Sequence, residues 1–395
     1  MFIMLSGQLN ITIARRHSTL MTGFIARKKK MKKLYIFGFI TLSFIYCDCI
    51  NSSSPQSVLE KYLNNNNNKK YNRSYKLLST KSQELATLSE YINYFQFADT
   101  THKERYTITK ILELEKDINQ PSFKRFKYEG FYTVGKDTIK NRNYFTLINE
   151  NSDWKIVWNG TILKMAVEKN NKGDYDGAIK IFEKAIEIDP YDAYAYTAQA
   201  WCYNSIISAL HNSQKRAEIL NKISSNIKYA IALEPDIAHH FNALSMYFGL
   251  LDNNDLVIEN YKKAIYYSLN EEDKIGLYAN LSISYQNKRE YNNAIITVLK
   301  AIKSDSTFTF AWFRYGSILN DMKKDNIAKR IYEKAIKLEP MEVRLQAPLY
   351  YSYSYTCFKL KDFISAKEYI LKALEMDPDD DRYKNLYQRI NYFTK

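Results

Sequence analysis

Apolar residues in the second half of the chain recur in pairs of short runs with helical spacing. In the clearest pair, Thr309 to Pro340, the polar residues 323–326 separate the two runs. Pro340 ends the second run, because its ring clashes with the preceding turn and it has no N–H. Gly316 and Ala328 have almost no side chain, so the sequence predicts a closely packed helical hairpin. The apolar faces are Trp312, Tyr315, Gly316 and Leu319 in the first helix, and Ala328, Ile331, Tyr332, Ala335 and Ile336 in the second.

One hairpin cannot bury its apolar faces alone, so copies are expected to stack on either side of it. The sequence contains such copies before and after this hairpin. Second helices are predicted to end at residues 190, 235, 269, 306, 340 and 378, which are 45, 34, 37, 34 and 38 residues apart. This period and its small-residue sites resemble the tetratricopeptide repeat, over roughly residues 160–395. The resemblance implies an all-α solenoid of six hairpins over 161–378, and we expect a capping helix over 379–395. The recurring small residues are Ala178, Ala294, Ala328 and Ala366 at the start of the second helix, and Ala185, Ala230, Ala264, Ala301, Ala335 and Ala373 near its end.

The second repeat is irregular. About eleven extra residues lie between Tyr203 and Ile223, which predicts either lengthened helices or a longer loop. Cys202 and Cys357 fall inside repeat helices and are expected to be small buried residues. The junction after Trp158 is short, so a fixed contact is expected between the repeats and the region before them.

Residues 52–160 have a different pattern. Helical runs begin at Pro55, at Tyr71 and at Ser79 or Thr80, and the asparagine run 64–68 breaks the first of them. After Thr100 the pattern becomes alternating and rich in β-branched and aromatic residues, which is typical of strands. Three helices followed by a four-stranded antiparallel sheet predict an α+β domain. The expected strands cover residues 105–114, 122–134, 142–150 and 153–160.

The order of these elements resembles the cone-like fold of nuclear transport factor 2 and ketosteroid isomerase. The segments SPQSVLEKYLNNNNNKKYNRSYKLLS and TLINENSDWKIVW carry the likeness. Some members of that superfamily are isomerases or dehydratases with an acidic base inside the cone. His102, with Asp99 and Glu104 beside it, is the candidate here, but the polar segment around it is more typical of a solvated loop. Trp154 and Trp158 are expected to pack the cone or its junction.

The formal net charge of +14 is concentrated at the start of the chain. Residues 1–33 hold eight basic and no acidic residues, so 49 basic and 43 acidic residues remain, a net charge of +6. This ordinary balance does not favour nucleic-acid binding. A basic run, an apolar core over Leu34–Tyr46 and then polar residues have the layout of a secretory signal. Residues 1–50 are therefore predicted to be a leader, with Met1 or Met31 as the start, and the protein to be exported to the cell envelope, membrane-anchored or periplasmic.

Cys47 and Cys49 close the apolar core of the leader. Their position suits a lipoprotein, and Cys47 is the predicted lipid-attachment residue. Tyr46 stands where bacterial lipoproteins usually carry a small residue, so an uncleaved or conventionally cleaved leader stays an open alternative.

In the tetratricopeptide family, first helices of successive hairpins line a concave groove that holds a peptide. Asn280 and Arg314 match two places of the family's carboxylate clamp, but Met246 and Phe310 replace its other Asn and its Lys. The pair His239-His240 has no third ligand, so neither a metal site nor a cofactor is predicted. The resemblance places on the groove Tyr194, Trp201, His239, Asn242, Met246, Asn280, Ile283, Phe310, Phe313, Arg314, Ser317, Tyr351 and Tyr355.

These features predict a non-enzymatic scaffold or adaptor of a bacterial envelope, which binds an extended peptide of another protein in the groove. One alternative is a cone domain that binds a small molecule or catalyses a reaction while the repeats position it. A second alternative is a polysaccharide-binding surface built from some of the 34 tyrosines.

Overall fold

The computed structural model describes residues 53–101, 107–114, 120–134, 137–207, 210, 212–338 and 343–394. The predicted leader, with Met31, Cys47 and Cys49, lies outside these residues, as do His102 and Glu104 of the candidate acidic cluster. The described chain forms two compact units that divide between Cys202 and Tyr203. Each unit is described by itself.

The first helix, α2 (Pro55–Asn67), is longer than predicted. The Ser54 hydroxyl caps it by accepting a hydrogen bond from the Ser57 N–H. The asparagine run does not break the helix but forms its last turn, and Asn68 follows as the C-cap. Both the backbone N–H and the side chain of Asn68 donate to the backbone oxygen of Asn64, at 3.1 Å and 2.8 Å, which closes the last turn of the helix.

The third predicted helix is two helices, which is a further correction. After α3 (Tyr71–Tyr75), Ser79 caps α4 (Thr80–Leu85) as expected. A separate helix, α5 (Leu88–Thr101), then begins at a reciprocal capping box. Thr87 N–H donates to Glu90 Oε2 at 2.8 Å, and Glu90 N–H donates to the Thr87 hydroxyl at 3.3 Å. This box starts a new helix at the break.

The sheet is antiparallel, with the strand order β1-β2-β3-β4. Asn151 and Ser152 both have positive φ, and they form the two-residue turn between β3 and β4 that the sequence predicts. Strand β3 begins five residues earlier than expected, because its polar first residues pair with the end of β2. The strands are β1 (Thr107–Glu113), β2 (Phe123–Val134), β3 (Asp137–Glu150) and β4 (Asp153–Ile156).

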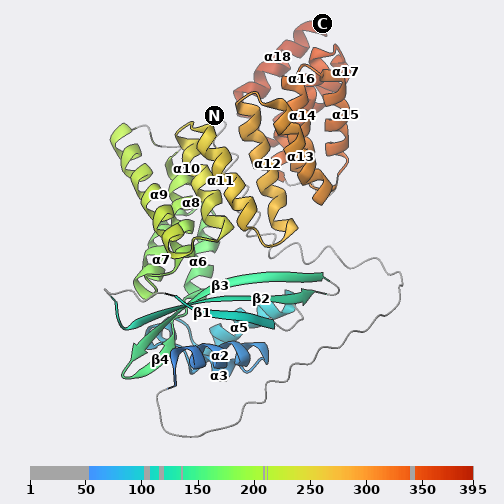
Figure 1. The fold of residues 1–395 in the computed structure, drawn as a ribbon. Helices are drawn as coiled ribbons and strands as arrows, with labels where there is room; N and C mark the ends of the chain where they lie inside the picture. The colour runs from blue at the N-terminus through green and yellow to red at the C-terminus, as the bar shows by residue number, and fades with distance from the viewer. Residues whose placement is uncertain are drawn as a thin grey trace, which may run out of the picture. The chain divides into compact units, whose positions relative to one another are not determined.

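One face of the sheet packs against the first helices, which lie below it in Figure 1. Tyr91, Phe126 and Leu147 are each fully buried in this core. Trp158 contacts the rings of Tyr91 and Phe95 from α5. The apolar core therefore holds the sheet and α5 together, and Trp158 packs at the junction.

Helices α6 (Gly160–Asn171) and α7 (Tyr175–Ile188) form the first hairpin and belong to the same unit as the sheet (Figure 1). The ring of Tyr191, just after α7, lies 5.6 Å from that of Phe123 on β2. Asn159 Nδ2 donates to Asp192 Oδ2 at 2.7 Å. The sheet and the first hairpin are thus in direct contact.

In the second unit the pairs α10–α11, α12–α13, α14–α15 and α16–α17 follow one another, and α18 packs on the last of them. In the irregular second repeat, the extra residues lengthen the second helix, α9, to 21 residues (Figure 1). The helices are α8 (Ala193–Ile207), α9 (Ser213–Leu233), α10 (Ala238–Leu250), α11 (Asn254–Tyr267), α12 (Glu271–Asn287), α13 (Tyr291–Ser304), α14 (Thr309–Asp321), α15 (Asp325–Ile336), α16 (Val343–Lys359), α17 (Phe363–Met376) and α18 (Asp381–Phe393).

Five of the six hairpins turn in the same way. Each places one residue in the left-handed region directly before the N-cap of its second helix. In the first hairpin that residue is a glycine, which adopts positive φ without strain. In the others it is a larger residue. The residues and their φ angles are Gly173 (82°), Asp252 (53°), Arg289 (61°), Lys323 (59°) and Lys361 (62°).

Candidate functional site

A chain of polar side chains links the first helices of successive hairpins in the second unit. Arg314 on α14 donates from Nη2 to Gln286 Oε1 on α12 at 2.6 Å. Gln286 in turn donates from Nε2 to Asp321 Oδ2 at 2.6 Å and to Ser317 Oγ at 3.1 Å. One glutamine therefore joins a cation and a carboxylate of the neighbouring hairpin.

The chain continues to the next hairpin through Asn320. Its Nδ2 donates to Thr356 Oγ1 on α16 at 2.8 Å and to the Tyr332 hydroxyl at 3.2 Å. The Thr356 hydroxyl donates to the backbone oxygen of Ser352 at 2.7 Å. These bonds connect α12, α14 and α16 side by side, which fixes the register of three hairpins along their first-helix surface.

Arg314 is the buried charge in this network. Arg314 is only 3% exposed, and burial lowers its pKa to about 10, although the nearby Tyr332 and Asp321 partly oppose this. Its Nε has no hydrogen-bond partner. The sequence predicts that Arg314 lies on the groove, where its side chain would bond a backbone or carboxylate group of the peptide. In the structure its side chain is instead buried, and Nη2 donates to Gln286 inside the protein.

Most of the predicted groove residues are buried as well, and the phenylalanines of α14 pack within their own hairpin. Phe313 lies 6.2 Å from the ring of Tyr332, and Phe310 lies between the rings of Phe308 and Phe313. Periodicity does not give the depth of the side chains, and the assignment of these residues to a groove stays a prediction. The buried members are Trp201, Asn242, Met246, Asn280, Phe310, Phe313 and Arg314, the half-buried ones His239, Ile283, Ser317, Tyr351 and Tyr355, and Tyr194 is exposed.

The predicted groove residues do not all lie in one unit. Tyr194 and Trp201 belong to the unit of the sheet, and the others belong to the second unit. A continuous groove over all six hairpins therefore stays a prediction. The first-helix surface described below is that of α10, α12, α14 and α16 alone.

The accessible aromatic part of this surface lies on α16. The rings of Tyr351 and Tyr355 are stacked with centroids 6.4 Å apart. The Arg382 guanidinium of α18 lies 5.9 Å from the Tyr351 ring, and the Lys359 ammonium lies 5.8 Å from the Tyr355 ring. Each ring therefore has a cation beside it, through a cation–π contact. This end can contact a segment that carries both apolar and polar groups.

The contribution of α18 is the feature that the sequence analysis missed. The sequence predicts only a capping helix over 379–395. In the structure the exposed Arg389 lies 4.9 Å from the ring of Phe358 on α16, and Phe393 stacks on Phe363 at 5.9 Å. The signal that could have found this is the spacing of Arg382 and Arg389, which places both on one side of the helix.

The histidine pair His239-His240 lies on α10. His240 Nε2 lies 3.4 Å from Glu234 Oε2. Burial and the neighbouring His240 lower the pKa of His239 to about 3. Over the residues that the structure describes, no three His, Cys, Asp or Glu side chains are grouped to hold a metal ion.

A family model described as the tetratricopeptide repeat matches four segments of the chain, at residues 162–192, 275–308, 311–340 and 347–380. Each segment begins in the first helix of a hairpin described above and includes its second helix. These segments are tetratricopeptide repeats. Between the first and second matched repeats lie the helices α8 to α11, of which α10 and α11 pack as a pair.

Known proteins with such repeats are similar to this chain. The TPR repeat-containing protein MJ1428 of Methanocaldococcus jannaschii is 26% identical over 219 residues, which cover 52% of this chain and 35% of the relative. The match thus spans about a third of that relative. The crystal structure of PilW, a type IV pilus biogenesis factor, is 16% identical with a TM-score of 0.47, covering 57% of this chain and 96% of PilW. Pseudomonas aeruginosa PilF is 14% identical with a TM-score of 0.45, covering 58% of this chain and 96% of PilF.

The membrane predictions concern the leader, which the structure does not describe. Within the described part of the chain, none of the helices combines the length and the apolar character needed to cross a bilayer. The assignment of Cys47 as the lipid-attachment residue stays a prediction.

Proposed function

We propose that this protein is a non-enzymatic scaffold whose tetratricopeptide repeats hold an extended segment of another protein. The contact centres on the first-helix surface of α16. The observation that carries the proposal is the stacked pair Tyr351 and Tyr355, half-buried and flanked by Arg382 and Lys359. Tyrosine and arginine are enriched where proteins bind each other, because they bury large areas and still bond polar groups.

The sequence-based choice of Arg314 as the centre of the peptide contact is revised in this proposal. A buried arginine that already bonds Gln286 holds the hairpins in register, and a partner would have to break that bond to use it. The tyrosines on α16 need no such rearrangement.

Site-specific photo-crosslinking tests this proposal. We expect p-benzoylphenylalanine in place of Tyr355 to capture a defined partner from intact cells. The same group in place of Tyr266, which is 80% exposed on the second helix α11, should not capture it. The double variant Tyr351→Ala and Tyr355→Ala should lose the partner in a pull-down and keep its helical circular dichroism. Equal capture at 355 and 266 would contradict the proposal.

We further propose that the protein acts in the cell envelope and is anchored by a lipid on Cys47. The basic run followed by the apolar core over residues 34–46 supports this, since that layout is typical of exported proteins. Metabolic labelling with an alkyne-tagged palmitate tests it. We expect the label in the wild type and in Cys49→Ser, and its loss in Cys47→Ser.

A further inference from the structure

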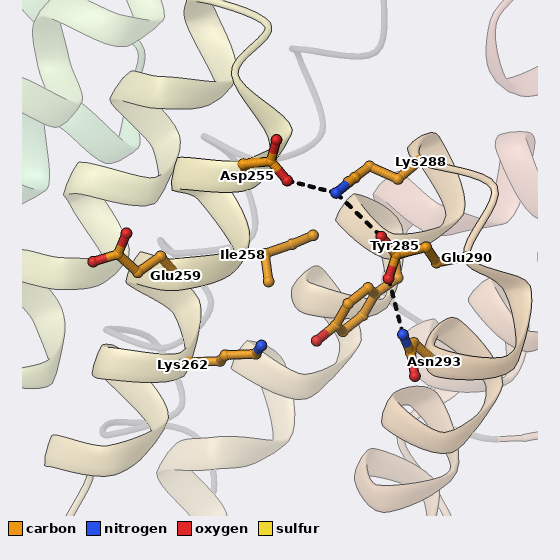
Figure 2. A pocket seen from close by; sticks show the side chains of 8 residues that line it. All are labelled: Asp255, Ile258, Glu259, Lys262, Tyr285, Lys288, Glu290 and Asn293. Atoms are coloured by element: carbon orange, nitrogen blue, oxygen red, sulfur yellow. Dashed lines mark hydrogen bonds and ion pairs between the residues drawn. The ribbon is translucent and has the colours of Figure 1, made fainter.

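A hollow of about 360 Å³ lies between the second helices α11 and α13, with the end of α12 beside it. Figure 2 shows Ile258 at its centre, Lys262 and Tyr285 on one side, and Asp255, Lys288 and Glu290 along its rim. Its volume falls in the range of about 300–1,000 Å³ that ligand sites usually have. Most of its lining comes from α11 and the start of α13, and Tyr285 comes from the last turn of α12.

The charges along the rim are already paired. Lys288 forms ion pairs with Asp255 and, at 3.1 Å, with Glu290. These two carboxylates raise the pKa of Lys288. Asn293 donates to the other oxygen of Glu290 at 2.9 Å. The rim is therefore a closed network of bonds rather than a set of free charges.

Lys262 differs from the other charged residues that line the hollow. Glu259 is bonded to Lys263 at 2.7 Å and points away from the hollow in Figure 2. For Lys262, the described residues provide no carboxylate within ion-pair distance. Its ammonium lies 5.9 Å from the centre of the Tyr285 ring, and Figure 2 shows the Tyr285 hydroxyl on the same side of the hollow.

A lysine ammonium and a phenol hydroxyl are both donors, and together they suit a carboxylate. The Ile258 side chain between them and the rim is apolar and only 7% exposed. It would contact the methylene groups that carry the carboxylate. Lys262 itself is exposed, so a carboxylate on the surface of a partner protein can reach its ammonium.

We propose that this hollow binds a glutamate or aspartate side chain of an acidic segment in a partner protein, through Lys262 and the Tyr285 hydroxyl. This site shares no residue with the contact on α16 proposed above. A partner could therefore occupy both surfaces, or two partners could bind at once.

Fluorescence anisotropy with the full-length protein tests the site, with labelled hexaglutamate as probe and labelled hexaglutamine as its neutral counterpart. We expect tighter binding of hexaglutamate, a loss of about tenfold in affinity for Lys262→Met, and a smaller loss for Tyr285→Phe. A charge-assisted hydrogen bond is typically strong enough to change affinity by that factor.

The matched control is Lys263→Met, which removes the same charge from the neighbouring position outside the hollow. Nonspecific attraction of a basic protein for a polyanion would fall equally in both variants. Equal losses for Lys262→Met and Lys263→Met, or no loss for Lys262→Met in a variant that melts like the wild type, would overturn the proposal. If glutarate competes at the same concentration as the peptide, the site binds a free dicarboxylate equally well. That result would overturn the proposal that the carboxylate belongs to a partner protein.

Discussion

The ring of Tyr332 occupies the space beside Gly316 that a Cβ atom would need. A Cβ built on Gly316 would lie 2.5 Å from Cε1 and 2.7 Å from Cδ1 of that ring. Tyr332 itself is only 1% exposed. The glycine on α14 thus lets the tyrosine of α15 lie directly against the backbone of its partner helix, and the two residues set the spacing of this hairpin.

Gly316→Ala should therefore destabilise the repeats. We expect a loss of about 1–3 kcal/mol in the free energy of unfolding, because a buried ring must shift to admit the methyl group. Gly249 on α10 is the matched control, since a Cβ there meets no atom within 4 Å. Gly249→Ala should be neutral or stabilising by up to about 1 kcal/mol. Urea denaturation followed by circular dichroism measures both, and equal effects would disprove the role of Tyr332.

The left-handed turn residues give a second prediction. Lys323 has a φ of 59°, which costs a residue with a Cβ about 1 kcal/mol. Lys323→Gly should relieve this strain and raise the melting temperature. The reverse change at the equivalent turn, Gly173→Ala, should lower it, although nothing lies within 4 Å of that Cβ. If both variants melt like the wild type, backbone strain does not limit these turns.

Much of the repeat architecture could be predicted from the sequence, because it depends on local features. Ala328 and Ala373 are fully buried where the small-residue pattern placed them, and Asp362 caps its helix through the Ser365 N–H. Local capping interactions also explain why two helix predictions in the region before the sheet were wrong. The bonds of Asn68 extend α2, and the Thr87–Glu90 box divides one predicted helix into two.

The binding residues were harder to predict, because they depend on contacts between hairpins. Helical spacing placed Arg314 on the first-helix surface, but its burial depends on Gln286, 28 residues earlier in the chain. Likewise, the distance between Lys262 and Tyr285 follows from how α11 packs on α12. Neither contact repeats with the period of the hairpins, so a single sequence gives no sign of it.

Loss of Arg314 should affect stability before binding. Arg314→Leu leaves Gln286 without its cation and removes the favourable charge beside Asp321, so we expect a loss of about 1–3 kcal/mol. Arg330→Leu on the exposed part of α15 is the control and should change stability by less than about 0.5 kcal/mol. Similar denaturation midpoints for the two variants would show that the polar chain contributes little.

Asp189 is a buried carboxyl group at the contact between the sheet and the first hairpin. It accepts a hydrogen bond from the Tyr191 N–H at 3.0 Å and one from the Thr146 side chain on β3. Burial, and then the nearby charge of Asp192, raise its pKa to about 7, although Arg125 on β2 partly opposes this. In the folded protein this carboxyl group therefore keeps its proton far above its usual range.

The stability of the first unit should consequently fall as the pH rises. Between the ordinary pKa of 3.8 and the folded value of about 7, the folded state binds more protons than the unfolded state. The contribution is therefore complete below about pH 4 and is lost as the pH passes 7. Asp189→Asn cannot ionise and still accepts the Tyr191 hydrogen bond. Its melting temperature should match the wild type at pH 4 and exceed it at pH 8, whereas the exposed control Asp176→Asn should follow the wild type throughout. A constant difference between Asp189→Asn and the wild type from pH 4 to 8 would mean that Asp189 does not titrate in this range.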